Sequence, residues 1–436
     1  MEPITIGYIG IAVLVILLFS GLHIGVVMGL LGFVGMVYLL GWNSALGQIK
    51  ITTYTSFANY DLSVIPLFVL MGEFCFHGNI SGDLYKAAHK FFGSLRGGLA
   101  MATIGACAAF AAVSGSSMAT AATMSTIALP EMRKHNYDLS LATGTLAAGG
   151  TIGILIPPSV IMVVYGVITS TSIGKLFLAG FIPGILQAIM FIGVIGFLCW
   201  RNPKLGPAGE SSPFLEKIKS LKNTWIVILL FLIVIGGIYF GWFSPSAGAG
   251  IGATGAFLFA LGRKKLTWKQ FTNSLIETVR TTGMIFFIYL GAMILGYFFA
   301  VTRLPNEFAT VISGLHVSKY IIWTGIVIVY LILGCLMDSL AMVLLTVPIL
   351  FPLMCGAQGL GFDPVWFGIM IVIVVEMGMI TPPVGMNVFV IKGMAQDVPT
   401  YTIFKGIVPF LLTDIFEVAV LTVFPVIVLW LPQVLK

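Results

Sequence analysis

Runs of about 20 mostly apolar residues recur along this chain from its beginning to its end, and each is long enough to cross a bilayer as an α-helix. Only 9% of the residues are charged, whereas a soluble domain has about 25%. The first run is not a cleavable signal, because no basic segment precedes residues 4–19 and a second apolar run follows at once. The sequence therefore predicts an all-α polytopic membrane protein.

Two of the long apolar stretches, 97–131 and 319–354, differ from the others. Each carries a polar segment with Ser or Asp near its middle and ends near a proline, Pro130 or Pro352. We expect both to be re-entrant hairpins, which enter and leave the bilayer on one side. The remaining stretches give about ten expected spans, at 4–20, 22–41, 61–78, 138–170, 176–200, 223–241, 246–262, 282–300, 363–395 and 400–432.

The basic residues favour this arrangement over one in which 97–131 crosses the bilayer once. With the N-terminus outside, most of the 22 Lys and Arg residues fall on the inner side, as the positive-inside rule predicts. A single crossing at 97–131 would separate Arg96 from Arg133 and move the later basic loops outside. We therefore expect a multi-pass protein of the bacterial cytoplasmic membrane with both termini on the periplasmic side.

A polar linker at 201–222 divides the chain into two halves with the same pattern. Residues 1–200 and 223–436 each hold five expected spans and one hairpin, and because five is odd the second half must be inverted in the membrane. The expected broken spans are 138–170 in the first half and 363–395 in the second. Short amphipathic segments precede both hairpins and are expected to lie in the membrane plane as arm helices, at 83–95 and 305–318.

Both broken spans contain a Pro-Pro pair, in GILIPPSVIM (153–162) and GMITPPVGMN (378–387). Proline has no N–H and crowds the carbonyl four residues earlier, so these pairs should free the carbonyls of Gly153, Ile154, Gly378 and Met379. Unsatisfied carbonyls are not tolerated against lipid, so a polar partner must meet them. A hard cation such as Na⁺ prefers oxygen ligands and is a suitable partner. Inverted repeats with paired broken helices are typical of secondary transporters.

The hairpin tips should provide the rest of two ion sites. AVSGSSMAT (112–120) and CLMDSLAM (335–342) place hydroxyl and carboxyl groups at mid-membrane depth. One end of each tip offers carbonyls to a cation and the other offers N–H groups to an anion. The expected Na⁺ ligands are Ser114, Gly115, Ser116, Gly150, Thr151, Gly153, Ile154, Asp338, Ser339, Gly378, Met379 and Thr381.

An anionic substrate is expected between the tips, at Ser117, Ser159 and Asn387, with Arg303 as a group that draws it in. Glu376 lies deep in a span, two residues before Gly378, and is a candidate coupling residue or a buried structural group. Glu73, Asp414 and Glu417 are expected to bind partners within the scaffold. The histidines and the five cysteines have no metal-ligand spacing, so no transition-metal site is expected.

These segments resemble the large membrane (M) subunit of tripartite ATP-independent periplasmic (TRAP) transporters, the DctM-like family. The resemblance covers nearly the whole chain and is strongest in FAAVSGSSMATAATMSTIALPEM (110–132) and AAGGTIGILIPPS (147–159). It implies Na⁺-driven import of an organic anion such as a C4-dicarboxylate or sialic acid. It also implies an elevator mechanism, in which hairpins and broken helices move as one transport domain against a scaffold. A small four-helix membrane subunit and a periplasmic substrate-binding protein complete such systems. Because this chain starts at the first span of the large subunit, the small subunit is expected as a separate chain.

Two other functions remain possible from the sequence. A stand-alone divalent-anion/sodium symporter shares the expected architecture but needs no binding protein. An intramembrane enzyme could use a serine of SGSS as nucleophile, although no His or Lys is placed near it as a general base. The sequence contains no P-loop motif, so no ATP hydrolysis and no organic cofactor are expected from this chain. The substrate itself cannot be read from these residues.

Overall fold

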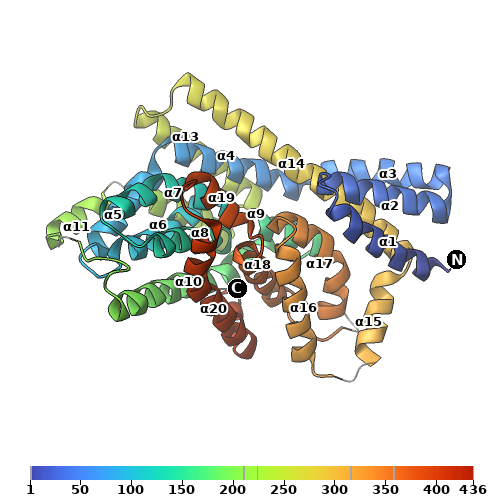
Figure 1. Cartoon of the computed structure of the whole chain (residues 1–436). Coiled ribbons are helices and arrows are strands. Elements are labelled where there is room, and N and C mark those ends of the chain that lie inside the picture. The colour runs from blue at the N-terminus through green and yellow to red at the C-terminus, as the bar shows by residue number, and fades with distance from the viewer. Residues whose placement is uncertain (1, 210–211, 223, 315–316, 357–358, 436) are drawn as a thin grey trace.

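The computed structural model describes residues 2–209, 212–222, 224–314, 317–356 and 359–435. All regular elements in these ranges are helices, which confirms the predicted all-α class (Figure 1). Met1 and Lys436, the two ends whose membrane side was predicted, lie outside the described residues.

The helices of the first half run from α1 to α10. Three of them, α1 (Pro3–Leu18), α2 (Ile24–Leu40) and α3 (Trp42–Phe57), precede the short 3₁₀ helix η1 (Tyr60–Ser63). The rest are α4 (Val64–His77), α5 (Ile80–Phe92), α6 (Gly98–Ser114), α7 (Ser117–Lys134), α8 (Leu139–Leu155), α9 (Val160–Thr169) and α10 (Ile173–Arg201). The predicted hairpin 97–131 thus corresponds to α6 and α7, and the predicted broken span 138–170 to α8 and α9, which meet at a bend of 42°.

The second half repeats this order of elements. After α11 (Phe214–Leu221) come α12 (Trp225–Tyr239), α13 (Pro245–Gly262), α14 (Trp268–Val301), α15 (Leu304–Gly314), α16 (Lys319–Gly334), α17 (Ser339–Cys355), α18 (Pro364–Ile380), α19 (Met386–Met394), α20 (Thr400–Val423) and α21 (Val426–Val434). In the first half an arm helix (α5) is followed by a chain reversal (α6–α7), a broken helix (α8–α9) and a long helix (α10). In the second half the same order recurs as α15, α16–α17, α18–α19 and α20. Residues 315–316 of the second predicted arm lie outside the described residues.

Four elements differ from the predicted spans. A helix not predicted, α3, has the sequence WNSALGQIKITTYTSF, which is too polar to count as an apolar run. The linker contains α11, and α14 begins at Trp268 rather than at residue 282. The span predicted at 400–432 is not one continuous helix, because α20 ends at Val423 and α21 begins at Val426, although α20 alone is long and apolar enough to cross a membrane. Proline at 425 has no N–H to continue the helix.

Five described helices are both long and apolar enough to cross a membrane alone: η1–α4, α10, α13, α14 and α20. Six further apolar helices have 10–17 residues: α1, α2, α6, α16, α17 and α18. The number of spans, predicted as about ten, therefore stays a prediction. Many large hydrophobic side chains on α1, α2 and α12 are exposed, as expected for helices that face lipid.

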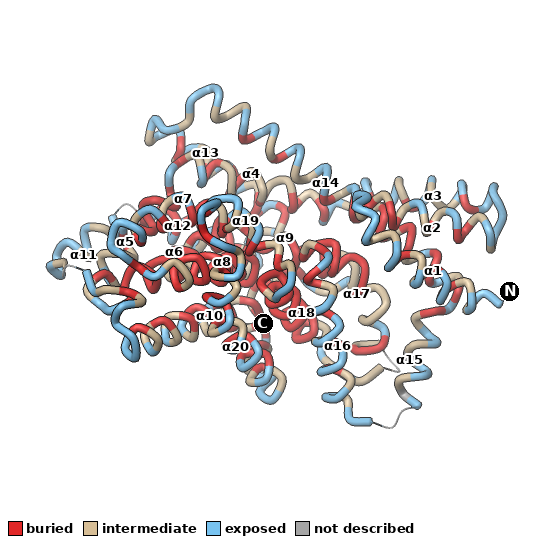
Figure 2. Tube along the Cα trace, in the orientation of Figure 1, coloured by how far each residue is buried: buried red, intermediate tan, exposed pale blue. Residues whose placement is uncertain are grey.

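The two broken helices form the centre of the molecule. Every residue of α18 from Val365 to Ile380 is buried, and so is every residue of α8 from Leu141 to Leu155 (Figure 2). A helix that is apolar on all sides is suited either to a protein core or to lipid, and these two lie in the core. Here α7 and α20 pack on α8, while α16, α17 and α20 pack on α18.

Outer helices of each half pack against the other half. From the first half, α2 packs along α14 of the second, and α13 of the second half packs along α4 of the first (Figure 1). The α2–α14 contact depends on glycine: a Cβ at Gly32 would lie 2.8 Å from the backbone of Leu295. The closeness of the two backbones leaves no room for a side chain.

We predict that Gly32→Ala lowers the thermal unfolding midpoint of the purified protein, because the new methyl group forces the α2 and α14 backbones apart. Overpacking of this kind costs about 1–3 kcal/mol. The matched control is Gly296→Ala on α14, where nothing lies within 4 Å of the new Cβ and helix propensity improves. Equal midpoints for both variants would contradict the tight contact.

Candidate functional site

The two chain reversals, α6–α7 and α16–α17, meet at one cavity of about 810 Å³. Ser114, Gly115 and Ser116 line it from the first tip, and Asp338 and Ser339 from the second. Residues beside both breaks and on α4 and α14 complete its wall, among them Ile154, Val160, Met386, Glu73, His77, Asn273, Glu277 and Thr281. Six of the predicted site residues therefore share one cavity, although the two tips are more than 200 residues apart in the chain.

The first tip rests on the break between α8 and α9. Gly115 has a φ of +61°, which favours glycine, and a Cβ there would lie 2.9 Å from the carbonyl oxygen of Pro158. Ser116 caps α7, since its Oγ accepts a hydrogen bond from the N–H of Ala119 at 3.3 Å. Thr120, which sequence reasoning missed, donates from Oγ1 to the carbonyl of Ser116 at 2.8 Å. Its only sequence signal is a hydroxyl one turn after the tip.

Gly150 and Gly153 let α7 approach α8 closely. A Cβ at Gly153 would lie 2.9 Å from the carbonyl oxygen of Ser116, and one at Gly150 would lie 3.2 Å from that of Ser117. Neither glycine lines the cavity. Thr151, also a predicted ligand, is buried and donates to the carbonyl of Ala148 in its own helix at 2.7 Å.

The second tip is built around Asp338. Its Oδ1 accepts hydrogen bonds from the N–H groups of Leu340 at 3.0 Å and Ala341 at 3.1 Å, so the carboxylate caps α17. Cys335 donates from Sγ to the carbonyl of Pro382 at 3.3 Å, which ties the tip to the second break. The Pro157–Pro158 and Pro382–Pro383 peptide bonds are both cis.

One predicted free carbonyl is not free. The carbonyl of Gly378 accepts from the N–H of Thr381 at 3.1 Å, because the last turn of α18 tightens to an i+3 bond. The Oγ1 of Thr381 donates to the carbonyl of Met377 at 2.7 Å. For Gly153, Ile154 and Met379, the residue four positions later is a proline, so the normal helical donor is missing.

The other predicted residues fall in two groups. Ser117, Ser159, Asn387 and Glu376 are buried and do not line the cavity. Neither polar atom of Asn387 has a hydrogen-bond partner within the described ranges. Ser159 caps α9 by accepting from the N–H of Met162 at 3.4 Å. The carboxyl group of Glu376 faces the hydroxyls of Ser117 and Ser339, one from each tip helix, without a hydrogen bond of normal geometry. Arg303 is exposed in the turn after α14 and does not line the cavity.

The charges around the cavity are acidic. Glu73, Glu277 and Asp338 line it, and among the described lining residues there is no Lys or Arg. An organic anion in this cavity therefore has helix N-terminal N–H groups and hydroxyls as its protein partners, and it gains from any cation bound nearby.

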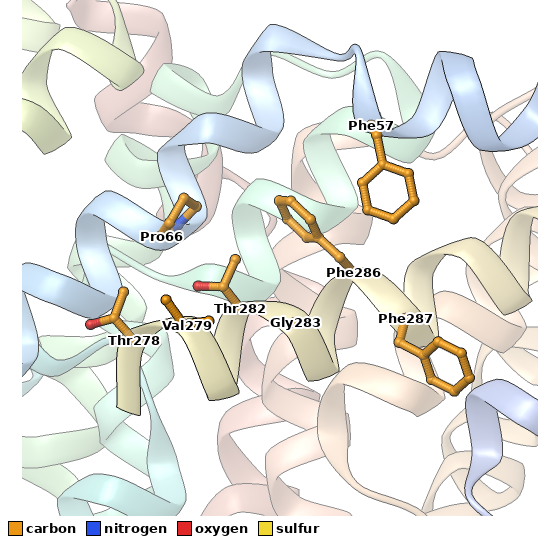
Figure 3. A pocket seen from close by; sticks show the side chains of 8 residues that line it. All are labelled: Phe57, Pro66, Thr278, Val279, Thr282, Gly283, Phe286 and Phe287. Carbon is orange, nitrogen blue, oxygen red and sulfur yellow. The ribbon is translucent and has the colours of Figure 1, made fainter. Parts of the chain in front are cut away.

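A second groove, of about 440 Å³, lies between α14, α4 and the end of α3 (Figure 3). Phe57, Pro66, Phe286 and Phe287 make its walls mainly apolar, and Thr278 and Thr282 supply the side-chain hydroxyls. Because it has no charged or amide group among its lining residues, it is a poorer site for an anion than the cavity at the tips.

The family model described as "Tripartite ATP-independent periplasmic transporter, DctM component" matches residues 11–427. The chain belongs to this family. It is 35% identical to the C4-dicarboxylate TRAP transporter large permease protein DctM of Pseudomonas aeruginosa, over 92% of this chain and 93% of that one. It is 33% identical to the sialic acid TRAP transporter large permease protein SiaM of Vibrio cholerae, over 96% of each chain.

Among solved structures, the fold is similar to that of the YdaH transporter of Alcanivorax borkumensis, with a TM-score of 0.58, 14% identity and 89% coverage of both chains. The chain is thus a TRAP transporter large permease component, a membrane transport protein and not an enzyme. The resemblance seen in the sequence is confirmed, and the intramembrane-enzyme alternative is set aside.

We predict that Asp338→Ala and Asp338→Asn separate the capping role of this residue from a role in cation binding. Alanine removes the cap of α17 and should lower stability by about 1 kcal/mol, whereas asparagine keeps an acceptor and should retain most of the cap. If Asp338 also binds a cation, both variants lose stabilisation by Na⁺, measured as the shift of the thermal midpoint between choline and sodium buffers. An unchanged shift in Asp338→Asn would leave capping as its role.

Proposed function

We propose that this chain imports a small organic anion, such as a C4-dicarboxylate or sialic acid, by coupling its movement to Na⁺. The observation that carries the proposal is the single cavity at which both tips meet, lined by three carboxylates and no Lys or Arg among its described residues. Bringing an anion into this acidic cavity is unfavourable unless cations enter with it. Co-binding of Na⁺ and substrate supplies the attraction that the side chains lack.

The proposed cation sites lie where each tip meets a break. In the first half, the hydroxyls of Ser114 and Ser116 lie beside the break that leaves the carbonyls of Gly153 and Ile154 without their helical donors. In the second half, Asp338 and Ser339 line the cavity, and Cys335 of the same tip donates from Sγ to the carbonyl of Thr381 at 3.8 Å. The adjacent break leaves the carbonyl of Met379 without its helical donor. Oxygen ligands of these kinds suit Na⁺. Gly150, Thr151 and Gly378 support these sites by packing.

The anion is expected at the N-terminal end of α7 rather than of α17. Asp338 already accepts from two N–H groups at the start of α17 and places a negative charge there. At the start of α7 the cap is the neutral hydroxyl of Ser116, which accepts one N–H at 3.3 Å. The positive end of the α7 dipole is therefore the better partner for a carboxylate.

The transport movement we propose is an elevator in which the tips and broken helices move as one block. The block would comprise α6–α9 and α16–α19, with α5 and α15 as arms, in two repeats of opposite membrane orientation. The recurring element order supports the repeat, and α4 and α14, which form the remaining cavity wall, would belong to the scaffold. In this arrangement both termini lie on the periplasmic side.

We infer two partners from the family description, which names a tripartite and periplasmic system. A periplasmic binding protein would deliver the anion, and a small four-helix membrane subunit would be a separate chain. A stand-alone symporter, which needs no binding protein, is the alternative.

The test is uptake of radiolabelled succinate and of radiolabelled sialic acid into liposomes that contain the chain with its small subunit. We expect uptake of one substrate class that needs both an inward Na⁺ gradient and the cognate binding protein. Uptake without the binding protein would support the stand-alone symporter. Uptake that ignores the Na⁺ gradient would overturn the cation sites.

A matched pair of variants refines the test. Ser116→Ala should reduce uptake at least several-fold at low Na⁺ and less at high Na⁺, because it removes an oxygen of the first site. Thr126→Ala on the same helix is the control, since its hydroxyl already donates to the carbonyl of Thr123 and does not line the cavity. Equal losses at all Na⁺ concentrations would argue against a cation role for Ser116.

A further inference from the structure

A second group of buried carboxylates lies outside the cavity, on α20. Asp414 and Glu417 are one helical turn apart and are 1% and 0% exposed. Gln187 of α10, 2% exposed, donates from Nε2 to Oδ1 of Asp414 at 2.9 Å, so its amide is directed at this pair. None of the three residues lines the cavity at the tips.

Four oxygen atoms of this group have no hydrogen-bond partner among the described residues. They are Oδ2 of Asp414, both carboxyl oxygens of Glu417 and the amide oxygen Oε1 of Gln187. Gln187 is the independent indication of a ligand, because a neutral amide does not need to be neutralised and yet its buried acceptor is left unpaired. Buried acceptors without a donor cost about 1–3 kcal/mol each.

No described basic side chain compensates the two carboxylates, since neither takes part in an ion pair. The elements packed against α20 are α8, α10, α18, α19 and α21. Glu376 on α18 is a further acid that faces Asp414. Neither α8 nor α21 carries a titratable side chain, and the basic residues of α10 and α19 are Lys175, Arg201 and Lys392. Of these, Lys175 and Arg201 lie near the two ends of α10, and Lys392 donates to the carbonyls of Gln396 and Val398.

We propose that Gln187, Asp414 and Glu417 form a third cation site, which binds one monovalent cation, Na⁺ or a proton. Two unpaired buried carboxylates cannot both remain charged without a counter-charge. The four unpartnered oxygens, from three side chains, are the kind of ligand that a hard cation prefers. A proton shared by the two carboxyl groups would also neutralise one of the two charges, and it needs fewer ligands than Na⁺. The site differs in kind from the sites at the tips, because side chains of α10 and α20 build it and no helix break takes part.

The test measures thermal unfolding of the full-length purified protein without substrate or partners, so a negative result here leaves the proposed transport function untouched. The variants are Asp414→Asn, Glu417→Gln and the double variant, which keep shape and hydrogen-bonding groups while removing charge. The control is Glu307→Gln, the same change at an exposed position of α15. Each is measured across a Na⁺ series, with choline replacing Na⁺, and across pH 6 to 9 without Na⁺.

If the site binds Na⁺, the rise of the midpoint with log Na⁺ should lose about a third of its slope in the double variant, since one of three sites is gone. If it binds a proton, the wild-type midpoint should fall as pH rises, because the folded state loses a bound proton, and this fall should shrink in the double variant. The control should match the wild type in both series. A double variant with the wild-type response to both Na⁺ and pH would overturn the proposal. Should it fail to fold, Glu417→Gln, which leaves the Gln187–Asp414 bond intact, provides the same comparison.

Discussion

The structure depends on satisfying backbone groups at two breaks in its most buried helices. Both α8 and α18 are surrounded along nearly their whole length, and both end just before a Pro-Pro pair. Pro157 and Pro158 are buried, whereas Pro382 and Pro383 are exposed. Hydrocarbon offers no partners for the groups exposed there, so protein or a bound ion must supply them. The tip of α16–α17 supplies one such partner, the thiol of Cys335, which donates to the carbonyl of Pro382. The tip of α6–α7 packs closely on the first break, where Gly115 leaves room for the carbonyl of Pro158.

Much of this arrangement could be predicted because its signals are strong and local. A Pro-Pro pair inside an apolar run has one main physical outcome, a break in the helix. A Ser-rich or Asp-bearing segment inside such a run likewise favours a reversal of the chain. The reversals do occur at Gly115–Ser116 and just before Asp338. The shared cavity was expected from the symmetry of the halves, although no single stretch of sequence contains it.

The errors also have physical causes. The polar sequence of α3 hides a helix, since its Gln, Lys and Thr residues break the apolar pattern on which spans were assigned. The i+3 bond that occupies the carbonyl of Gly378 depends on how tightly the backbone closes in the last turn of α18, which the sequence does not show. Thr120 bonds to Ser116 within its own tip, whereas Gln187 contributes through a contact between helices far apart in the chain. A lone hydroxyl or amide in an apolar run is ambiguous by itself. Asp414 was expected to find a partner and does so in Gln187, whereas Glu417 has none among the described residues.

The packing of outer helices of each half against the other half bears on how such a chain can be assembled. Because α13 packs on α4 and α14 packs on α2, the first half cannot complete its packing during synthesis before the second half emerges from the ribosome. The first half must wait in the bilayer with the face of α4 exposed to lipid until residues 245–262 arrive. The same contacts make the two halves of the chain mutually dependent, since a substitution on α2 is constrained by the α14 backbone that packs on it.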